Sequence, residues 1–171
     1  MIFRELMEKD TDAFLKLKQI GLKANPESFV ASINEDSPDY AIKVKERIKK
    51  ASIENGDIIL GAFDPDLIGI ISITRDKRLK RFHKADLHGM FVKHEYRGNG
   101  IGKTLFEKAL TMVKNMKGLE EIQLSVDSEN KSACALYQKF GFTIAWKEKH
   151  ATKLDSGYVD AYHMIKNLLD N

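Results

Sequence analysis

The chain has 171 residues, of which 28 are Lys or Arg and 25 are Asp or Glu, so its formal net charge is only +3. This length suits a single domain with a substantial core, and the weak positive charge indicates no particular partner. The lone cysteine, Cys134, excludes an intramolecular disulfide and a cysteine-rich metal site.

The first half of the chain contains apolar segments separated by clear turn signals. Asp10 can cap a first helix, and the Asn-Pro pair at 25–26 ends it. A second helix carries lysines and an arginine on the face opposite its apolar residues. The predicted elements are a strand at 2–6, a helix at 10–24 with Ala13 or Phe14, Leu17, Ile20 and Ala24 on its apolar face, a helix at 41–51 with Ala41, Val44, Ile48 and Ala51 on its apolar face, and strands at 57–63 and 67–74.

The second half alternates strands with helices. A basic connection at 77–84 leads into an apolar strand that ends at Val92. The elements predicted after it are a helix at 101–116, a strand at 121–126, a helix at 131–140 and strands at 142–149 and 157–166. The order β-α-α-β-β-β-α-β-α-β-β predicts an α/β layer fold, with a mixed central sheet of six to seven strands flanked by about four helices.

A glycine-rich turn, Arg-Gly-Asn-Gly-Ile-Gly at 97–102, lies between the apolar run 87–92 and the helix at 101–116. The first N–H groups of a helix have no internal partner, and the helix dipole favours negative charge at that end. Glycine lets the backbone approach a ligand without a Cβ in the way. The turn therefore predicts a site for a ligand that carries phosphate.

Glycine spacing separates the possible phosphate ligands. A P-loop needs a glycine five residues before its Gly-Lys-Thr triplet, but Arg97 holds that place relative to 102–104. A dinucleotide fingerprint needs glycine at a sixth position, and none stands there when counting starts from Gly98 or Gly100. A nucleotide phosphohydrolase is disfavoured for the same reason, and because no convincing metal-binding aspartate follows an apolar strand.

A third pattern fits. Arg-x-x-Gly-x-Gly, formed by Arg97, Gly100 and Gly102, resembles the pyrophosphate loop of the GCN5-related N-acetyltransferase (GNAT) superfamily. A valine stands five residues before the arginine, as in that superfamily. A second block at 130–142 has the superfamily's asparagine-to-tyrosine spacing and its Gly-Phe ending. The resemblance covers residues 85–166 strongly and implies the GNAT fold over 1–171.

The resemblance implies acetyl-CoA, or coenzyme A, as the cosubstrate. Its pyrophosphate would lie on the N–H groups of the glycine turn, with Arg97 and Lys103 adding positive charge. Its pantetheine arm would pair with the strand edge at Val92, and the N–H of Met90 would stabilise the oxyanion that forms as an amine attacks. The cofactor-binding residues expected from the resemblance are Met90, Phe91, Val92, Arg97, Gly98, Asn99, Gly100, Ile101, Gly102, Lys103, Asn130, Ala133 and Tyr137.

Catalytic roles are also implied. Tyr137 is the expected general acid for the leaving thiolate, and Asn130 either contacts pantetheine or simply caps its helix. Asp86 and His88 precede Met90 by four and two residues, so strand alternation predicts that all three share one face. In the arylalkylamine N-acetyltransferases two histidines hold the matching places. His88 titrates near neutral pH as a free side chain and suits general-base work, although a surface histidine with a satisfied hydrogen bond is equally consistent.

Acceptor residues are harder to predict. Glu27 and Phe29 fall between the first two helices, a region that lines the acceptor pocket in the superfamily, but turn and core roles fit them equally well. Asp86 and His88 are the other candidates for contact with the amine. The expected activity is transfer of an acetyl group to a primary amine of a small molecule or peptide, by direct attack in a ternary complex. The alternative is a non-catalytic acyl-CoA-binding or sensing module on the same fold.

The sequence lacks the usual signals for binding a metal, a nucleic acid or a membrane. The scattered histidines lack metal-ligand spacing, so no metal is expected. The basic stretch 77–81 has no aromatic platform, which argues against nucleic acid. No apolar stretch could cross a bilayer, residues 1–5 do not begin a signal peptide, and one cysteine fits a reducing compartment, so we expect a cytoplasmic protein without a membrane partner. Dimers are frequent in the superfamily, which leaves a homodimer open.

Overall fold

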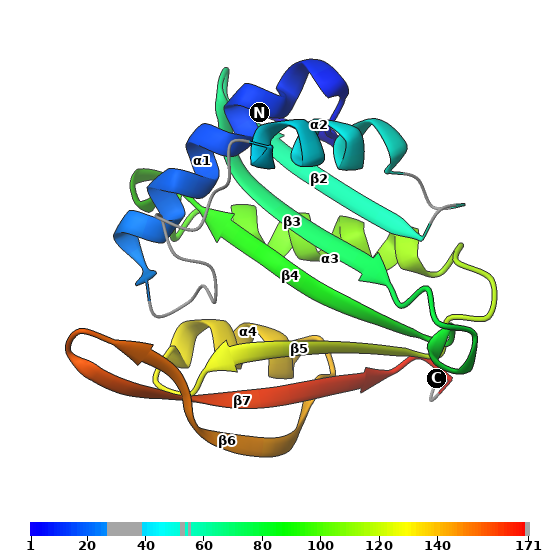
Figure 1. The fold of residues 1–171 in the computed structure, drawn as a ribbon, viewed down its shortest axis with the longest axis vertical. Helices are drawn as coiled ribbons and strands as arrows, with labels where there is room; N and C mark the ends of the chain where they lie inside the picture. Colours follow the sequence, from blue (N-terminus) through cyan, green and yellow to red (C-terminus); the bar gives the residue numbers. More distant parts are fainter. Residues whose placement is uncertain (27–38, 52–53, 55, 170–171) are drawn as a thin grey trace.

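The computed structural model describes residues 1–26, 39–51, 54 and 56–169. Within them a single sheet of seven strands is combined with α-helices and short 3₁₀ turns (Figure 1). The elements are β1 (Ile2–Glu5), η1 (Glu8–Asp10), α1 (Thr11–Ala24), α2 (Tyr40–Lys50), β2 (Asp57–Phe63), β3 (Leu67–Arg75), η4 (Leu79–Arg81), β4 (Lys84–Val92), η5 (His94–Tyr96), α3 (Ile101–Val113), β5 (Glu121–Asp127), α4 (Lys131–Lys139), β6 (Thr143–Leu154) and β7 (Gly157–Asn167).

The sheet is mixed, as the sequence predicts. Its strand order is β1-β2-β3-β4-β5-β7-β6, with a parallel pair, β4 and β5, among antiparallel neighbours. The predicted order of strands and helices is confirmed. The last hairpin is longer than predicted, because β6 continues to Leu154 and turns tightly into β7 at Gly157.

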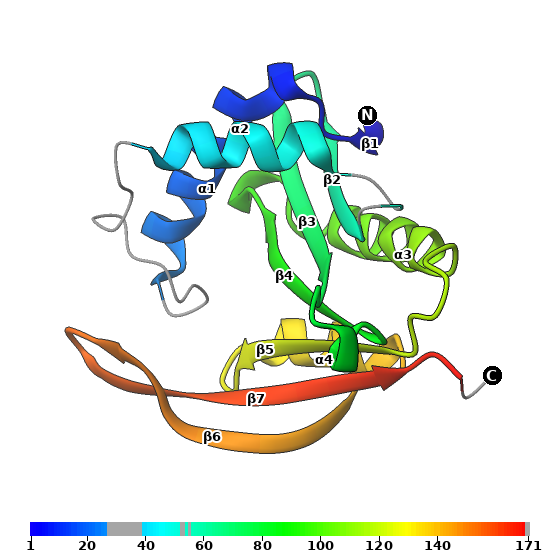
Figure 2. The same cartoon turned by 45° about the vertical axis from the view of Figure 1, so that its right-hand side comes forward.

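Two hydrophobic clusters lie on opposite faces of the sheet. On one face, Leu105 and Phe106 of α3 and Tyr137 of α4 pack against strand residues; on the other, Phe14 of α1 and Val44 of α2 do so. Figures 1 and 2 show the same layering, with α1 and α2 on one side of the sheet and α3 on the other. The apolar residues of the buried strands are divided between the two clusters, which fixes the register of these strands.

The predicted apolar faces of the first two helices need correction. In α1, Ile20 and Ala24 are exposed, and the buried stripe runs instead through Leu17 and Gly21, four residues apart. The stripe follows this i, i+4 row because that row faces the sheet. In α2, Arg47 is partly buried and not on the solvent side, since it lies three residues after the buried Val44.

The sheet opens between β4 and β5. The two strands pair only where Lys84–Asp86 meets Glu121–Gln123, and beyond this point they diverge (Figure 1). The following part of β4 pairs with β3 alone, while β5 continues alongside β7. The separation leaves an unpaired stretch of strand edge next to the glycine turn.

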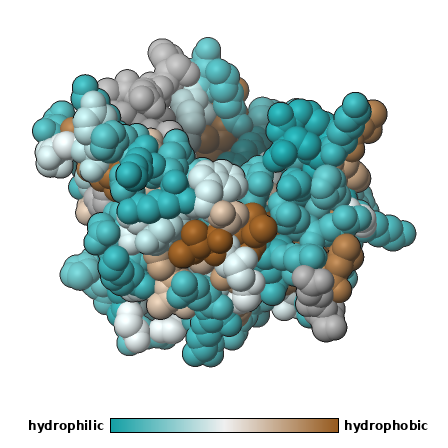
Figure 3. Space-filling view, turned by 90° about the horizontal axis from the view of Figure 1, so that it is seen from below, coloured by the Kyte–Doolittle hydropathy of each residue, from teal (hydrophilic) through white to brown (hydrophobic). Residues whose placement is uncertain are grey.

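Seen from below, the surface is mostly hydrophilic, with a small patch of hydrophobic side chains (Figure 3). On the edge strand β6, Ile144 and Trp146 are exposed. No helix in the described ranges is long and apolar enough to cross a membrane.

Candidate active site

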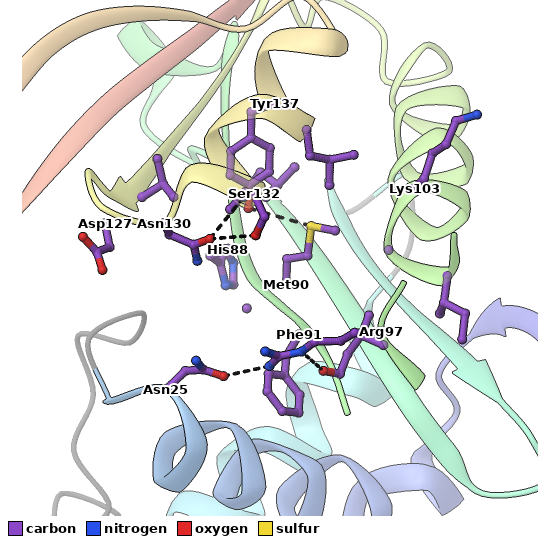
Figure 4. Close-up of a pocket in the computed structure, with 18 of the residues that line it drawn as sticks. Asn25, His88, Met90, Phe91, Arg97, Lys103, Asp127, Asn130, Ser132 and Tyr137 are labelled. Atoms are coloured by element: carbon purple, nitrogen blue, oxygen red, sulfur yellow. Dashed lines mark hydrogen bonds between the residues drawn. The ribbon is translucent and has the colours of Figure 1, made fainter. Parts of the chain in front are cut away.

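A cavity of about 760 Å³ lies where β4 and β5 separate. Its walls come from β4, the glycine turn, the start of α3, β5 and α4 (Figure 4). Asn99 and Asp86 do not line it, and Glu27 and Phe29 lie outside the described residues. The sequence-predicted residues that do line it are His88, Met90, Phe91, Val92, Arg97, Gly98, Gly100, Ile101, Gly102, Lys103, Asn130, Ala133 and Tyr137.

The glycine turn forms an open row of hydrogen-bond donors. Gly98 and Gly100 have φ angles of 80° and 78°, a conformation that favours glycine, and nothing lies within 4 Å of where a Cβ would be. Among the described residues, the backbone N–H groups from Gly98 to Lys103 donate to no acceptor in the protein. Donors at the start of a helix, with free space in front of them, fit a phosphate group.

The two basic residues of the turn are engaged with the protein. Arg97 donates from Nε to the Val92 carbonyl oxygen at 2.9 Å and from Nη2 to Asn25 Oδ1 at 2.7 Å (Figure 4). Lys103 pairs with Glu107 one helical turn later at 3.5 Å. Arg97 therefore ties the turn both to the end of β4 and to the end of α1, and its expected contribution to phosphate binding stays a prediction.

A β-bulge interrupts β4 at Gly89, which has a φ angle of 63°. The register with β3 shifts there, since Ser72 pairs with His88 while Ile70 pairs with Phe91. One extra residue in β4 reverses which side chains face which side of the sheet. The expectation that Asp86, His88 and Met90 share one face is therefore wrong. Met90 packs on the α3 side, whereas His88 is held from the α2 side by Arg47.

His88 belongs to a hydrogen-bonded group with Arg47 and Thr74. Its Nε2 lies 3.0 Å from Thr74 Oγ1 and 3.4 Å from Arg47 Nη2, and Arg47 also donates to Thr74 at 3.2 Å. Arginine can only donate, so this contact assigns Nε2 as the acceptor and the ring proton to Nδ1. Part of the ring remains open to solvent at the cavity wall.

The surroundings of His88 suppress its protonation. Desolvation in the concave wall, followed by the positive charge of Arg47, lowers the pKa of His88 to about 4. The expectation that this ring titrates near neutral pH is wrong, because the sequence revealed neither the desolvation of the ring in the fold nor the arginine beside it. His88 is neutral at pH 7, and it is a weak base whose available lone pair already accepts hydrogen bonds.

Tyr137 lies at the inner end of the cavity. Its hydroxyl donates to Met90 Sδ at 3.8 Å, and its ring lies 5.6 Å from that of Phe106 (Figure 4). Burial raises the pKa of Tyr137 to about 12, so the phenol keeps its proton at neutral pH. Among the described residues its hydroxyl has a weak sulfur acceptor and no other, so this protonated group can donate to a ligand in the cavity.

Asn130 caps α4. Its Oδ1 accepts hydrogen bonds from the Ala133 N–H and the Ser132 hydroxyl, each at 3.1 Å. Capping and ligand contact are compatible, because the cap uses only the amide oxygen while the residue also lines the cavity.

A second cavity, of about 670 Å³, adjoins the first. It lies between α1, α2 and β7, and it holds Asp86, which accepts a 2.7 Å hydrogen bond from Gln123. The residues that line both cavities are Leu87, His88, Gly89 and Ser125.

Sequence reasoning missed several residues of this second cavity, above all Arg47 and Trp146. Arg47 could have been found from its spacing of seven after Tyr40 and three after Val44, which puts these residues on one helix face. Trp146 carried no comparable signal, because its strand is exposed along most of its length.

Residues 17–142, more than half of the chain, match the model of the acetyltransferase (GNAT) family. The chain belongs to this family. As a GNAT protein it is an acetyl-CoA-dependent N-acetyltransferase, in agreement with the glycine turn and the second sequence block.

Individual relatives extend the likeness to the whole chain. The L-amino acid N-acetyltransferase AaaT of Escherichia coli K12 is 25% identical over 166 residues, 97% of each protein. The spermidine N(1)-acetyltransferase of Thermoplasma acidophilum is 39% identical over 95 residues, 54% of this chain and 55% of the relative. A GNAT acetyltransferase structure from Streptococcus pneumoniae superposes with a TM-score of 0.83 at 27% identity, covering 98% of this chain and 99% of that one.

Proposed function

We propose that this GNAT protein moves the acetyl group of acetyl-CoA to a primary amine of a small molecule or peptide, by direct attack in a ternary complex. The observation that carries this proposal is one cavity that joins an open row of N–H donors, a bulged strand edge and a protonated phenol. The free donors suit a pyrophosphate, and the unpaired edge of β4 suits the amides of a pantetheine arm.

The thioester supplies the activated carbonyl. The amine nitrogen forms a C–N bond to this carbon, and the C–S bond breaks. Over the whole reaction the ammonium substrate gives up two protons, one to the thiolate and one to solvent. In the proposed mechanism the N–H of Met90 stabilises the oxyanion. Tyr137 gives its proton to the thiolate and recovers one through water.

Solvent water is proposed to take the first proton of the ammonium. His88 fits this task poorly, because the pKa of its ring is lowered to about 4 and its Nε2 accepts hydrogen bonds from its neighbours. Asp86 lies on the second cavity, where its carboxylate can attract an ammonium group.

The names of the two relatives point to different acceptors, an L-amino acid and spermidine. The test of the proposal is therefore an assay of free thiol released from acetyl-CoA across amino acids, polyamines, aminoglycosides and peptides, with product mass as confirmation. Thiol release that depends on the amine, with a product 42 Da heavier (about one acetyl group), supports the enzyme. Acetyl-CoA binding without turnover on any amine supports the sensing module.

A further inference from the structure

The second cavity is lined by cations from three different parts of the chain. Lys18 comes from α1, Arg47 from α2 and Arg81 from η4, while Asp86 contributes a negative charge. Arg81 is neutralised by Asp76 at 2.7 Å, and Lys18 bonds the Tyr40 hydroxyl at 2.6 Å. Arg47 differs from Arg81, because the hydrogen bonds that it donates to described residues go to the neutral partners Thr74 and His88.

A partly buried guanidinium whose hydrogen-bond partners are neutral can attract an anion, although the Asp57 carboxylate already offsets part of the charge of Arg47. Burial lowers the pKa of Arg47, yet an arginine side chain remains protonated in proteins. The charge thus persists at the cavity wall, and the hydrogen bonds that Arg47 donates to described residues use only Nη2, which leaves the other nitrogens of the planar fork able to donate. This geometry suits the two oxygens of a carboxylate.

The position of Arg47 relates the anion to the reacting nitrogen. Arg47 Nη2 lies 3.4 Å from the ring of His88, and His88 and Gly89 line both cavities. An amine that reaches a thioester in the first cavity from the second cavity would pass this shared wall. A carboxylate on Arg47 would therefore belong to the carbon that carries the amine, or to one close to it. Asp86, two residues before His88 on the same face of β4, adds negative charge that attracts the ammonium.

The rest of the second cavity is largely apolar. Phe14 and Tyr40 stand on the helix side, and Trp146 stands on the β6 side. This lining favours an acceptor with an apolar or aromatic side chain. A polyamine, by contrast, would bring further positive charge toward Arg47, which is unfavourable.

We propose that the second cavity binds an α-amino acid with an apolar side chain, whose carboxylate pairs with Arg47 while its amino group lies at the wall formed by His88 and Gly89. This inference names the acceptor of the acetyl transfer proposed above and rests on that function.

The test compares each amino acid with the amine that lacks only its carboxylate. L-phenylalanine, phenethylamine and L-phenylalaninamide form one set, L-leucine and isopentylamine another, and spermidine represents polyamines. At saturating acetyl-CoA, kcat/KM should be about 10-fold or more higher for each amino acid than for its amine. Arg47→Gln should lower kcat/KM for the amino acids by about 10- to 100-fold, mainly through KM, and should leave the amines nearly unchanged. Arg47→Lys should restore part of the loss, since it keeps the charge without the fork.

Lys43→Gln is the matched control, because it removes the same charge from an exposed position of α2 that does not line the cavity. Lys43→Gln should change kcat/KM neither for the amino acids nor for the amines. The melting temperature and acetyl-CoA affinity of each variant verify that the fold is intact. Wild-type protein that prefers the amines or spermidine, or an Arg47→Gln loss of equal size for amino acids and amines, overturns the proposal while acetyl transfer itself stands.

If no amine is acetylated, the proposed acetyl transfer is wrong, but the amino-acid site can still be tested. Calorimetry then measures the binding of L-phenylalanine to the acetyl-CoA-loaded protein. Binding to the wild type that Arg47→Gln abolishes supports it. No binding to the wild type, or equal binding to both proteins, overturns it.

Discussion

The two adjoining cavities are built in different ways. The first presents backbone groups, which are the N–H donors from Gly98 to Lys103 and the free edge of β4. The second presents side chains such as Arg47 and Trp146. A backbone site constrains the sequence only where glycine is required, so the same site can recur in proteins with different acceptors. A side-chain site can change its ligand with one substitution. The comparison therefore supports the proposal that the first cavity binds the shared cosubstrate and the second binds the individual acceptor.

The exception within the first cavity is Tyr137, and its loss has the largest expected effect. Tyr137→Phe removes the hydroxyl that donates to Met90 Sδ in the wall of the first cavity. The value of kcat should therefore fall about 100-fold or more, while the KM for acetyl-CoA stays similar. Thiol-release kinetics measure both constants. Tyr162→Phe removes a hydroxyl outside both cavities and should leave them unchanged; equal activity of the two variants would remove Tyr137 from the mechanism.

A substitution in the glycine turn should affect cosubstrate binding selectively. Gly100→Val forces a β-branched residue into a left-handed backbone conformation at a cost of about 1–2 kcal/mol, which should weaken acetyl-CoA binding about 10-fold by distorting the row of N–H donors. Calorimetric titration measures the affinity. Gly157→Val, in the β6–β7 turn, introduces comparable strain far from the site. It should lower the melting temperature without weakening acetyl-CoA binding, and an equal loss of affinity in both variants would contradict a local role for the turn.

His88 should have a smaller effect, one that does not depend on pH near neutrality. Because the pKa of His88 is lowered to about 4, the ring is neutral throughout pH 6–9 (roughly two or more pH units above that pKa), and His88→Gln should change kcat by a similar factor across this range. Rate profiles of the wild type and the variant measure this. A loss that appears only on one side of a pKa near 7 would restore His88 as a general base.

The smallest expected effect concerns stability in acid. The pKa of His88 is about 4 in the folded protein and 6.5 for the free side chain, so the unfolded chain binds more protons between these values. The contribution of His88 to stability is therefore present above pH 6.5 and is lost as the pH falls toward 4. Denaturant unfolding should show a shallower acid decline for His88→Gln than for the wild type, and parallel declines would contradict the lowered pKa.

Sequence patterns predicted the local features of this protein and missed those that depend on distant residues. The glycine turn and the block from Asn130 to Tyr137 are continuous in sequence, so their spacing is visible before folding. The lowered pKa of His88 depends first on its desolvation in the folded protein and then on Arg47, which lies 41 residues away in the chain. The bulge at Gly89 had a local signal, since an isolated glycine within a strand often marks one, and strict alternation of side chains ends at such a bulge.

A crystal structure of the protein with acetyl-CoA tests the central claim most directly. The account predicts that the pyrophosphate contacts the N–H groups between Gly98 and Lys103, and that the thioester lies beside Met90 and Tyr137 in the gap between β4 and β5. Acetyl-CoA bound elsewhere on the protein, or with its thioester away from this gap, would contradict it.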